Sequence, residues 1–372
     1  MARYKEYGYD IQDGKVIIPE WETEIKEEAF EDCKELTSVE LPQWIKRIEP
    51  FAFYGCENLT EITLPECVEE IEEGAFNGCS SLTSISVSKD NKFFDSREGC
   101  NAIIYTESNT LIRGCENTII PPSVTEIGEE AFSGCKNLTS ITIPPSVTEI
   151  GDWAFSRCSS LTSITIPESV TKIGDNAFYG CSSLTSISIP PSVTDIGSSA
   201  FEGCTSLTGI TIPPSVTEIG NGAFRDCSSL TSTSIPESVT EIGHRAFWFC
   251  SSLTSISIPP SVTKIGNWAF SDCSSLTSIS IPQSVTEIGY DAFSGCSSLK
   301  SITIPPSVTE IGGYAFSRCS SLTSISIPPS VREIGYDAFS GCSSLTEVRI
   351  AKGCNVNESA FEDCPNVQII RY

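Results

Sequence analysis

Very few residues in this sequence have the chemistry or the spacing of a catalytic or metal-binding site. His244 is the single histidine among 372 residues, so a multi-histidine metal site or a histidine-relayed nucleophile could not form without it. No Gly-x-Ser-x-Gly elbow, glycine-rich phosphate loop or calcium-hand loop occurs. We therefore expect a non-enzymatic protein with no catalytic residue, no cofactor and no metal. We interpret His244 as a solvated surface histidine, because nothing near it in sequence resembles a nucleophile.

Eighteen cysteines could form disulfides or zinc sites, but their spacing favours a buried column. Fourteen of them, from Cys33 to Cys364, lie three residues after a recurring phenylalanine. A free cysteine in a core behaves as a small hydrophobe, and neighbours in one column point the same way, which disfavours bridges. No Cys-x-x-Cys pair suggests zinc. Cys100 and Cys115 lie off the column, and whether these two pair stays open.

A file of acidic residues could in principle bind calcium. Stacked carboxylates about 5 Å apart can hold Ca²⁺ between successive turns of a repeat structure. Lys172 and Lys264 interrupt the file, as Arg47 does earlier, so we favour a solvated charged face. The acidic members are Glu126, Glu149, Asp195, Glu218, Glu241, Glu287, Glu310 and Glu333.

The elements that position these residues are repeats. The dipeptide Ala-Phe recurs in steps of 23 residues, apart from one step of 56 and a last step of 22. This spacing predicts a single solenoid of about 14 units rather than several globular domains. The repeated phenylalanines are Phe30, Phe53, Phe76, Phe132, Phe155, Phe178, Phe201, Phe224, Phe247, Phe270, Phe293, Phe316, Phe339 and Phe361.

Each column of the repeat has a physical role. In residues 161–183, LTSITIPESVTKIGDNAFYGCSS, the β-branched segment before Pro167 suits a strand, and the proline ends it. Residues 175–181 have the spacing of a single helical or 3₁₀ turn. One unit cannot bury enough apolar surface to stand alone, so stacking is compulsory. The predicted fold is an α/β solenoid with a parallel sheet and one short helical or 3₁₀ turn per unit.

The ends and one insertion depart from the regular pattern. Residues 9–18 read as a hairpin with an Asp-Gly turn that covers the first strand edge. A second hairpin, from residues 102–105 and 110–113, is expected to project from the solenoid. We divide the chain into an N-terminal hairpin cap (1–18), acidic repeats (19–87), an irregular repeat with the projecting hairpin (88–119), regular repeats (120–350) and a C-terminal cap (351–372).

The charge balance excludes several partner classes. The chain has 23 basic and 48 acidic residues, a net charge of −25, and its first 80 residues hold 20 acidic and 7 basic groups. Such a surface repels phosphate backbones and anionic lipid heads, so we expect no nucleic-acid partner. No apolar run reaches the length of a membrane span, so we expect no membrane insertion. The start has no apolar signal segment, which favours a cytoplasmic location, and we expect a monomer.

The repeat LTSITIPPSVTEIGDWAFSRCSS, residues 138–160, resembles the BspA-like leucine-rich repeat, also called the Treponema pallidum type. The resemblance implies a horseshoe or superhelix with a parallel sheet on its concave side. It also implies relatives that are largely bacterial and protist surface proteins binding host proteins or other cells. A host or cell-surface protein is then the implied ligand, and a cell-surface or secreted location becomes the alternative. The chain lacks the asparagine ladder of ordinary leucine-rich repeats.

Four positions, two on each side of Ala-Phe, vary between otherwise near-identical repeats. They hold aromatic and arginine residues, the types that anchor protein interfaces. We predict that they line one ridge, and that the chain is an interaction or adhesion module presenting its concave sheet and this ridge to a protein ligand. Drift at unconstrained solvent positions would give the same variation. The ridge comprises Trp153, Arg157, Tyr179, Arg225, His244, Arg245, Trp248, Phe249, Trp268, Tyr290, Tyr314, Arg318 and Tyr336.

The strand surface suggests an alternative function. Thr162, Ser163 and Thr165, with their equivalents, form long hydroxyl files that resemble those of ice-binding solenoids. A small-ligand or lattice binder, for carbohydrate or ice, is therefore the alternative, although threonine is also simply a good exposed strand residue.

Thr233 interrupts an isoleucine column. Its hydroxyl needs a partner there, and we predict that Thr233→Ile raises thermal stability.

Overall fold

The computed structural model describes residues 3–372, which form stacked parallel β-coils with almost no helix. The coils fall into two compact units, unit 1 ending at Ser182 and unit 2 running from Ser183 to Tyr372. Helical structure in the described chain is limited to α1 (Arg3–Glu6) and the 3₁₀ turn η1 (Arg97–Gly99). The predicted parallel solenoid is confirmed. No helix among residues 3–372 is long and apolar enough to cross a membrane.

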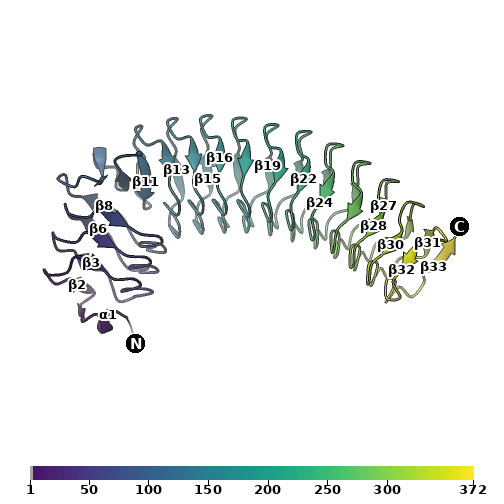
Figure 1. The fold of residues 1–372 in the computed structure, drawn as a ribbon, viewed down its shortest axis with the longest axis horizontal. Helices are drawn as coiled ribbons and strands as arrows, with labels where there is room; N and C mark the ends of the chain where they lie inside the picture. Colours follow the sequence, from purple (N-terminus) through teal and green to yellow (C-terminus); the bar gives the residue numbers. More distant parts are fainter. Residues whose placement is uncertain (1–2) are drawn as a thin grey trace. The chain divides into compact units, whose positions relative to one another are not determined.

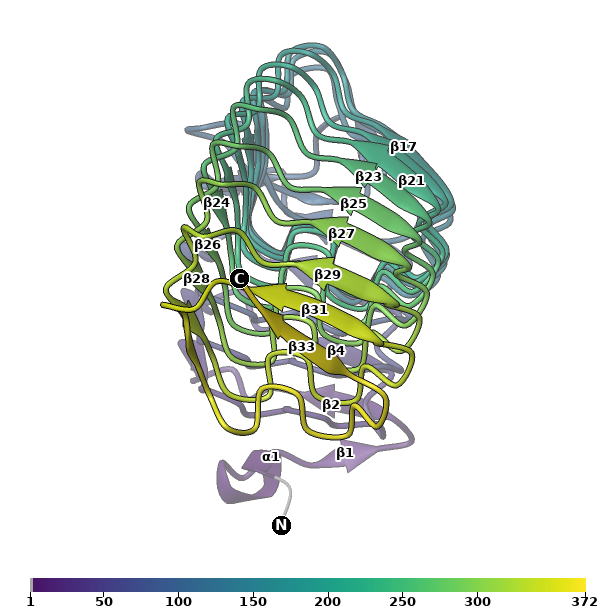
Figure 2. The ribbon, with the colours of Figure 1, turned by 90° about the vertical axis from the view of Figure 1, so that its right-hand side faces the viewer.

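In unit 2 each coil contributes one strand of mostly three residues to a parallel sheet (Figure 2). The register advances by one coil at each step, as in Ser255 opposite Ser278 and Ile256 opposite Ile279. The middle isoleucine is buried and the serines beside it are exposed, which is the two-residue alternation of a sheet with one solvated face. These strands are β17 (Ser186–Ser188), β19 (Gly209–Thr211), β21 (Ser232–Ser234), β23 (Ser255–Ser257), β25 (Ser278–Ser280), β27 (Ser301–Thr303), β29 (Ser324–Ser326), β31 (Glu347–Ile350) and β33 (Gln368–Arg371).

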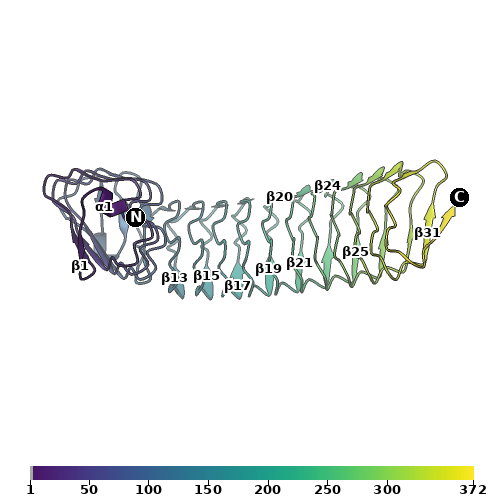
Figure 3. The ribbon, with the colours of Figure 1, turned by 90° about the horizontal axis from the view of Figure 1, so that it is seen from below.

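A second set of strands, two residues long, lies on the other side of each coil of unit 2 (Figures 2 and 3). Most of these strands pair in parallel with the next in chain order, and all but the last place an isoleucine inward and a charged residue outward. The coils follow one another along the chain from teal to yellow in Figure 1. The strands are β18 (Asp195–Ile196), β20 (Glu218–Ile219), β22 (Glu241–Ile242), β24 (Lys264–Ile265), β26 (Glu287–Ile288), β28 (Glu310–Ile311), β30 (Glu333–Ile334) and β32 (Asn355–Val356).

The core of unit 2 is a stack of phenylalanine rings. From Phe201 to Phe361 neighbouring ring centroids lie 5.2–5.7 Å apart, with the planes within 20° of parallel. The cysteine column packs beside the rings. Each Sγ contacts the phenylalanine carbonyl of the preceding coil, as Cys250 does with Phe224 at 3.1 Å. Repeated side chains therefore pile up along the axis, which is what makes an unstable single coil stable in the stack.

Unit 1 is built from the same coil. β1 (Ile11–Gln12) and β2 (Lys15–Ile17) lead one sheet, and α1 precedes them. All strand pairs beyond the hairpins are parallel. The other repeat strands of unit 1 are β3 (Glu24–Ile25), β4 (Ser38–Glu40), β5 (Arg47–Ile48), β6 (Glu61–Leu64), β7 (Glu70–Ile71), β8 (Ser84–Val87), β12 (Glu126–Ile127), β13 (Ser140–Thr142), β14 (Glu149–Ile150), β15 (Ser163–Thr165) and β16 (Lys172–Ile173).

The N-terminal hairpin is present and covers the start of the phenylalanine stack. β1 and β2 are antiparallel, joined by Asp13 and Gly14 with φ of 50° and 80°, as a tight primed turn requires. Two tyrosines extend the ring stack beyond Phe30: the ring centroid of Tyr9 lies 5.4 Å away and that of Tyr4 6.0 Å away. The cap therefore continues the core with aromatic rings rather than ending it in water.

The inserted hairpin does not project from unit 1, contrary to the expectation. β10 (Ile103–Tyr105) and β11 (Thr110–Arg113) are antiparallel as predicted, with β9 (Phe94–Asp95) beside them. However, β11 pairs in parallel with β12 and so extends the sheet of two-residue strands. Ile103, Ile104 and Leu111 are fully buried. The sequence pattern predicted only that the two strands pair with each other. The apolar residues on these strands draw the hairpin into the core.

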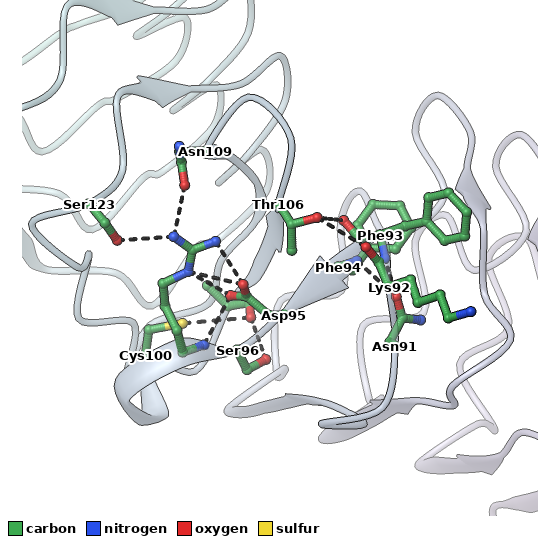
Figure 4. Close-up of polar contacts among 12 residues, drawn as sticks. Asn91, Lys92, Phe93, Phe94, Asp95, Ser96, Cys100, Thr106, Asn109 and Ser123 are labelled. Atoms are coloured by element: carbon green, nitrogen blue, oxygen red, sulfur yellow. Dashed lines mark hydrogen bonds and ion pairs between the residues drawn. The ribbon is translucent and has the colours of Figure 1, made fainter.

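A polar cluster fixes the insertion in place (Figure 4). The Arg97 guanidinium donates to both carboxylate oxygens of Asp95, with the shortest contact at 2.7 Å. Its Nη1 also donates to Asn109 Oδ1 at 2.8 Å and to Ser123 Oγ at 3.2 Å. Arg97 thereby links the hairpin turn to the next regular coil, and its donors are satisfied inside the fold.

The eighteen cysteines are all free thiols in the structure. Cys100 and Cys115 are both buried and have separate partners: Cys100 Sγ lies 3.8 Å from the Ala102 carbonyl, and Cys115 Sγ accepts from Asn101 Nδ2 at 3.2 Å. Burial raises the pKa of both thiols. The two are therefore protonated core residues and not a disulfide in this structure.

Candidate functional site

The Ala-Phe segment is a pair of hydrogen-bonded turns rather than a helix. In one coil the N–H of Ala154 donates to the Gly151 carbonyl at 3.3 Å, and that of Ser156 donates to the Trp153 carbonyl at 2.9 Å. These are the i→i+3 bonds of the expected 3₁₀ turn. Trp153 and Arg157, however, have φ of 56° and 57°, and such left-handed residues prevent the turn from continuing as a helix.

The left-handed positions are a regular feature of the ridge. The residue before Ala-Phe and the second residue after it have positive φ in almost every coil. Several coils place Gly, Asn or Asp there, as at Gly222, Asn176 and Asp226, and these residue types tolerate that conformation best. Seven of the predicted ridge residues also occupy such positions: Trp153, Arg157, Arg245, Phe249, Trp268, Tyr314 and Arg318.

The backbone conformation therefore restricts which residue types suit these ridge positions. A left-handed residue with a Cβ costs roughly 1–2 kcal/mol, and bulky side chains are rare there. Drift at such sites would favour Gly, Asn and Asp, which neighbouring coils do use. Tryptophan at Trp153 and Trp268 and phenylalanine at Phe249 run against this preference. A strained residue that is kept at a surface indicates function more often than chance.

In unit 2 the ridge side chains form a continuous path of contacts. Arg225 pairs with Glu202 at 3.0 Å, and its guanidinium carbon lies 4.6 Å from the Trp248 ring centroid. The Arg245 guanidinium lies 5.3 Å from the Trp248 centroid and 4.9 Å from that of Trp268. The sequence places these residues in four successive repeats, and stacking brings them together. The contacts of the two arginines with the tryptophan rings are cation–π interactions, which strengthen as water is excluded.

Aromatic rings extend the same path toward the C-terminus. Trp268 meets Tyr290 edge to face at 5.0 Å, and Tyr314 meets Tyr336 in the same way at 5.0 Å. Tyr290 joins the two pairs, with its centroid 5.6 Å from that of Tyr314. Burial, followed by a hydrogen bond with Tyr336, raises the pKa of Tyr290. Tyr290 is therefore neutral at physiological pH, and the tyrosines form an amphipathic surface of rings and hydroxyls.

The remaining ridge residues are less connected. Trp248 stacks on Phe249 at 4.9 Å, which brings Phe249 to the edge of the path. In unit 1, Trp153 and Tyr179 form a separate pair with centroids 5.8 Å apart. Arg157 and Arg318 are exposed and have no ion pair within residues 3–372. Of the thirteen predicted residues, the ring and arginine contacts of unit 2 join eight of them into one surface, namely Arg225, Arg245, Trp248, Phe249, Trp268, Tyr290, Tyr314 and Tyr336.

His244 is exposed, as expected, and it also belongs to a ladder of side chains that cap the next coil. Asn221 Oδ1 accepts from the His244 N–H at 2.8 Å, and His244 Nδ1 accepts from the Asn267 N–H at 2.9 Å. Asn267 Oδ1 accepts in turn from the Tyr290 N–H at 3.0 Å. Asp152 makes the same bond in unit 1. A short polar ladder therefore exists, in the turn column rather than where ordinary leucine-rich repeats have one.

An open groove of about 520 Å³ lies along this ladder in unit 2. Its lining combines the ladder side chains Asn221, His244 and Asn267 with Arg225, Arg245 and Trp268 of the path. Sequence reasoning missed Asn221, Asn267 and Glu202, although all three occupy variable positions beside Ala-Phe. A signal was present, since the column holding His244 repeats Asp or Asn at Asp152, Asp175, Asn221 and Asn267.

The other polar files contain internal partners. Among residues 3–372 no group of three or more acidic, histidine or cysteine side chains is arranged to hold a metal ion. In the acidic file Lys172 pairs with Glu149 at 2.8 Å, and Lys264 pairs with Glu241. The charge relief expected from the sequence thus occurs between adjacent coils.

Comparison with known proteins identifies the repeat. Residues 9–113, 104–231, 158–277 and 240–368 match the family described as the BspA type leucine-rich repeat region. A leucine-rich repeat protein from Bacteroides ovatus is 30% identical, covers 97% of each chain and superposes with a TM-score of 0.65. A leucine-rich cell surface protein from Faecalibacterium prausnitzii is 28% identical over 96% of this chain and 87% of its own, with a TM-score of 0.51. Among curated proteins, none matches.

Proposed function

Because the chain belongs to the BspA-type leucine-rich repeat family, we propose that it is a non-enzymatic interaction or adhesion module that binds a protein ligand. The family is one of repeat scaffolds and not of enzymes. We propose that the ligand contacts the ridge together with the adjacent sheet. The relative from Faecalibacterium prausnitzii is described as a cell surface protein, which supports a host or cell-surface protein as the ligand.

One observation carries this proposal: bulky aromatic and arginine residues occupy left-handed backbone positions where neighbouring coils use Gly, Asn or Asp. Trp268 and Arg245 bear that backbone cost and also form part of the contact path of unit 2. Tryptophan, tyrosine and arginine are the residue types that dominate binding energy at protein interfaces. A surface that combines them at a structural cost is best explained by selection for binding.

The alternative function has less support. The threonine hydroxyls of the file that contains Thr162 donate to backbone carbonyls of the preceding coil, as Thr231 does to Thr208 at 3.1 Å and Thr254 to Thr231 at 3.2 Å. A hydroxyl with its hydrogen engaged within the fold is less able to donate to a carbohydrate or an ice surface. The sheet face nevertheless remains the site at which that function would be tested.

The proposal is tested by adhesion of purified variants to immobilised extracellular-matrix proteins and host-cell membrane proteins. The ridge variant combines Trp153→Asn, Trp248→Ser and Trp268→Asn. Other coils already hold these residues at the equivalent positions, asparagine at Asn176 and serine at Ser271. Each replacement suits its backbone, so the coils should fold normally, as circular dichroism would verify. We expect at least a tenfold loss of adhesion, because hot-spot tryptophans contribute about 2 kcal/mol or more each.

The matched control alters the sheet instead. Thr208→Lys and Thr254→Lys introduce bulky side chains into the strand file, where Lys300 already stands in a later coil. We expect adhesion to be retained by this variant. Loss of adhesion in the strand variant, with retention in the ridge variant, would favour the carbohydrate or lattice function. Retention of adhesion in both variants would reject the ridge as the binding surface.

A further inference from the structure

The groove of unit 2 has an uneven supply of hydrogen-bonding groups. In the ladder along its floor, Asn221 Oδ1, His244 Nδ1 and Asn267 Oδ1 each accept a backbone N–H. These bonds also fix the orientation of the side chains, because only the oxygen of an amide or an unprotonated ring nitrogen can accept. The acceptors of the ladder are therefore used by the fold.

The ladder groups that remain available to a ligand are hydrogen-bond donors. Once the amide oxygens are engaged, Asn221 and Asn267 each retain Nδ2 with two hydrogens, and neutral His244 carries its hydrogen on Nε2. Within residues 3–372 these three nitrogens have no hydrogen-bond partner. They come from three successive coils, so they span about 10 Å at the usual spacing of about 4.8 Å between strands. The floor of the groove is thus a row of donors.

Arg245 adds a charged donor to that row. The charge of the nearby Arg225 is neutralised by Glu202. Arg245, in contrast, forms no ion pair or side-chain hydrogen bond with any described residue. Its guanidinium is instead held near two indole rings, those of Trp248 and Trp268. Ring contacts restrict the side chain while leaving its N–H groups unsatisfied, so little further ordering is needed when an acceptor arrives.

We propose that this groove binds a carboxylate side chain of an acidic, extended segment of the protein partner, with Arg245 as the carboxylate-binding residue. The planar guanidinium matches a carboxylate in a two-point contact. Carbonyl groups along an extended peptide, at about 3.3 Å per residue, supply acceptors for Asn221 and Asn267. Trp268 offers an apolar surface to the neighbouring side chains. The inference deepens the proposed function and rests on it.

A carboxylate is favoured over a phosphate because of charge. The chain carries a net charge of −25, and a dianionic phosphate meets more long-range repulsion from it than a single carboxylate does. The groove holds one unpaired arginine, which suits one negative charge. A peptide is favoured over an acidic sugar because the donors form a linear row across three coils and match repeated backbone carbonyls.

The experiment uses the full chain and two heptapeptide libraries on a membrane array. The libraries are capped at both ends and random at six positions, with the central residue fixed as glutamate in one and glutamine in the other. We expect the glutamate library to retain the labelled chain and the glutamine library to retain at least tenfold less, since a charge-assisted bond exceeds a neutral one by about 1.4 kcal/mol or more. Equal retention would overturn the proposal.

Variants locate the effect. Arg245→Asn places at this left-handed position the residue that Asn176 supplies in another coil, so folding should be preserved. For the best glutamate peptide we expect its Kd to rise at least tenfold by fluorescence polarisation. Arg332→Thr removes another exposed arginine, outside both the groove and the ridge, at a position where Thr309 stands in the preceding coil, and should leave the Kd unchanged. Equal losses in the two variants would show a general charge effect and overturn the assignment.

Competition distinguishes the sources of negative charge. Glucuronate and inorganic phosphate should displace the peptide only at concentrations far above that of the free peptide, and displacement at comparable concentrations would overturn the peptide assignment.

The two proposals can fail separately. If the tryptophan variant loses adhesion while glutamate and glutamine peptides bind alike, only the carboxylate site is rejected. If Arg245→Asn weakens peptide binding while the tryptophan variant still adheres, the ridge as an adhesion surface is rejected.

Discussion

The first coil of unit 1 and the coils near Trp248 in unit 2 place different chemistry on the same backbone positions. In unit 1 the two left-handed positions hold Glu28 and Asp32, which pair with Arg3 and Lys34. In unit 2 the equivalent positions of one coil hold Arg245 and Phe249, whose partners are aromatic rings.

The difference separates solubility from recognition. Exposed ion pairs contribute about 0–1 kcal/mol, so the charged turns of unit 1 add little stability and keep the end of a solenoid soluble. An arginine between tryptophans is partly desolvated already, and a ligand that covers it loses less hydration. Short acidic residues also tolerate the left-handed backbone better than tryptophan does. The same turn is therefore less strained at Asp32 of the first coil than at Phe249 of unit 2.

The largest difference between the units should appear in the phenylalanine stack. Phe247 lies between Phe224 and Phe270, whereas Phe76 stacks on Phe53 and borders a cavity of about 230 Å³ beside the insertion. We expect Phe247→Ala to lower the free energy of unfolding by about 3–5 kcal/mol, and Phe76→Ala to lower it by less. Urea unfolding followed by circular dichroism measures both. A greater loss for Phe76→Ala would show that the insertion does not weaken the stack.

A second comparison concerns the residue after the inward isoleucine of each two-residue strand. A Cβ added to Gly266 would lie 2.6 Å from backbone atoms of Gly243 and His244, whereas unit 1 already holds Glu72 in this column. We expect Gly266→Ala to destabilise by about 1–3 kcal/mol through overpacking. Glu72→Ala should stay within about 0.5 kcal/mol, since it changes a partly exposed side chain. Thermal melts of both variants test the contrast, and equal shifts would contradict close coil contact as the reason for glycine.

The sequence could predict those features of the structure that repeat with the 23-residue step, and it could not predict those that occur once. The 23-residue step fixed the parallel stacking, the phenylalanine column and the cysteine column, because identical residues at equal spacing must meet. It also brought most of the ridge together. The left-handed backbone at Trp153 and Arg245 was missed because their side-chain types argue against it, although Asn176 and Gly222 in the same column favour that conformation. The buried insertion was missed for a related reason, because its contacts occur only once.

Carboxylates in unit 1 should give opposite pH responses according to their surroundings. Burial, and then Glu130, Asp152 and Glu73, raise the pKa of Glu129. The folded state therefore retains the proton longer than the unfolded state, and stability falls as pH rises from the unfolded value through the raised one. We expect Glu129→Gln to remove this loss and to raise the melting temperature at pH 7.

The matched variant is Glu57→Gln. Lys136 and Lys34 lower the pKa of Glu57 through hydrogen bonds and charge, so its contribution is present above the unfolded pKa and disappears as pH falls through the folded one. We expect this variant to melt slightly lower at pH 7 and to match the parent in acid. Melting curves from pH 3 to 8 compare the two, and shifts of the same sign would contradict the assigned causes.

The smallest effect is expected at Thr233 in unit 2, where two contributions oppose each other. Its hydroxyl donates to the Ile210 carbonyl at 3.1 Å, so the partner that the sequence could not show is present. Thr233→Ile removes this bond, worth about 0.5–1.5 kcal/mol, and restores apolar burial like that of Ile210 and Ile256, worth about 1–2 kcal/mol. We expect a rise in melting temperature of no more than a few degrees. Thr233→Val separates the contributions, because it keeps the volume and removes only the hydroxyl. A fall in melting temperature with valine, together with a rise with isoleucine, would confirm both. A fall with both would show that the hydrogen bond outweighs the packing in this column.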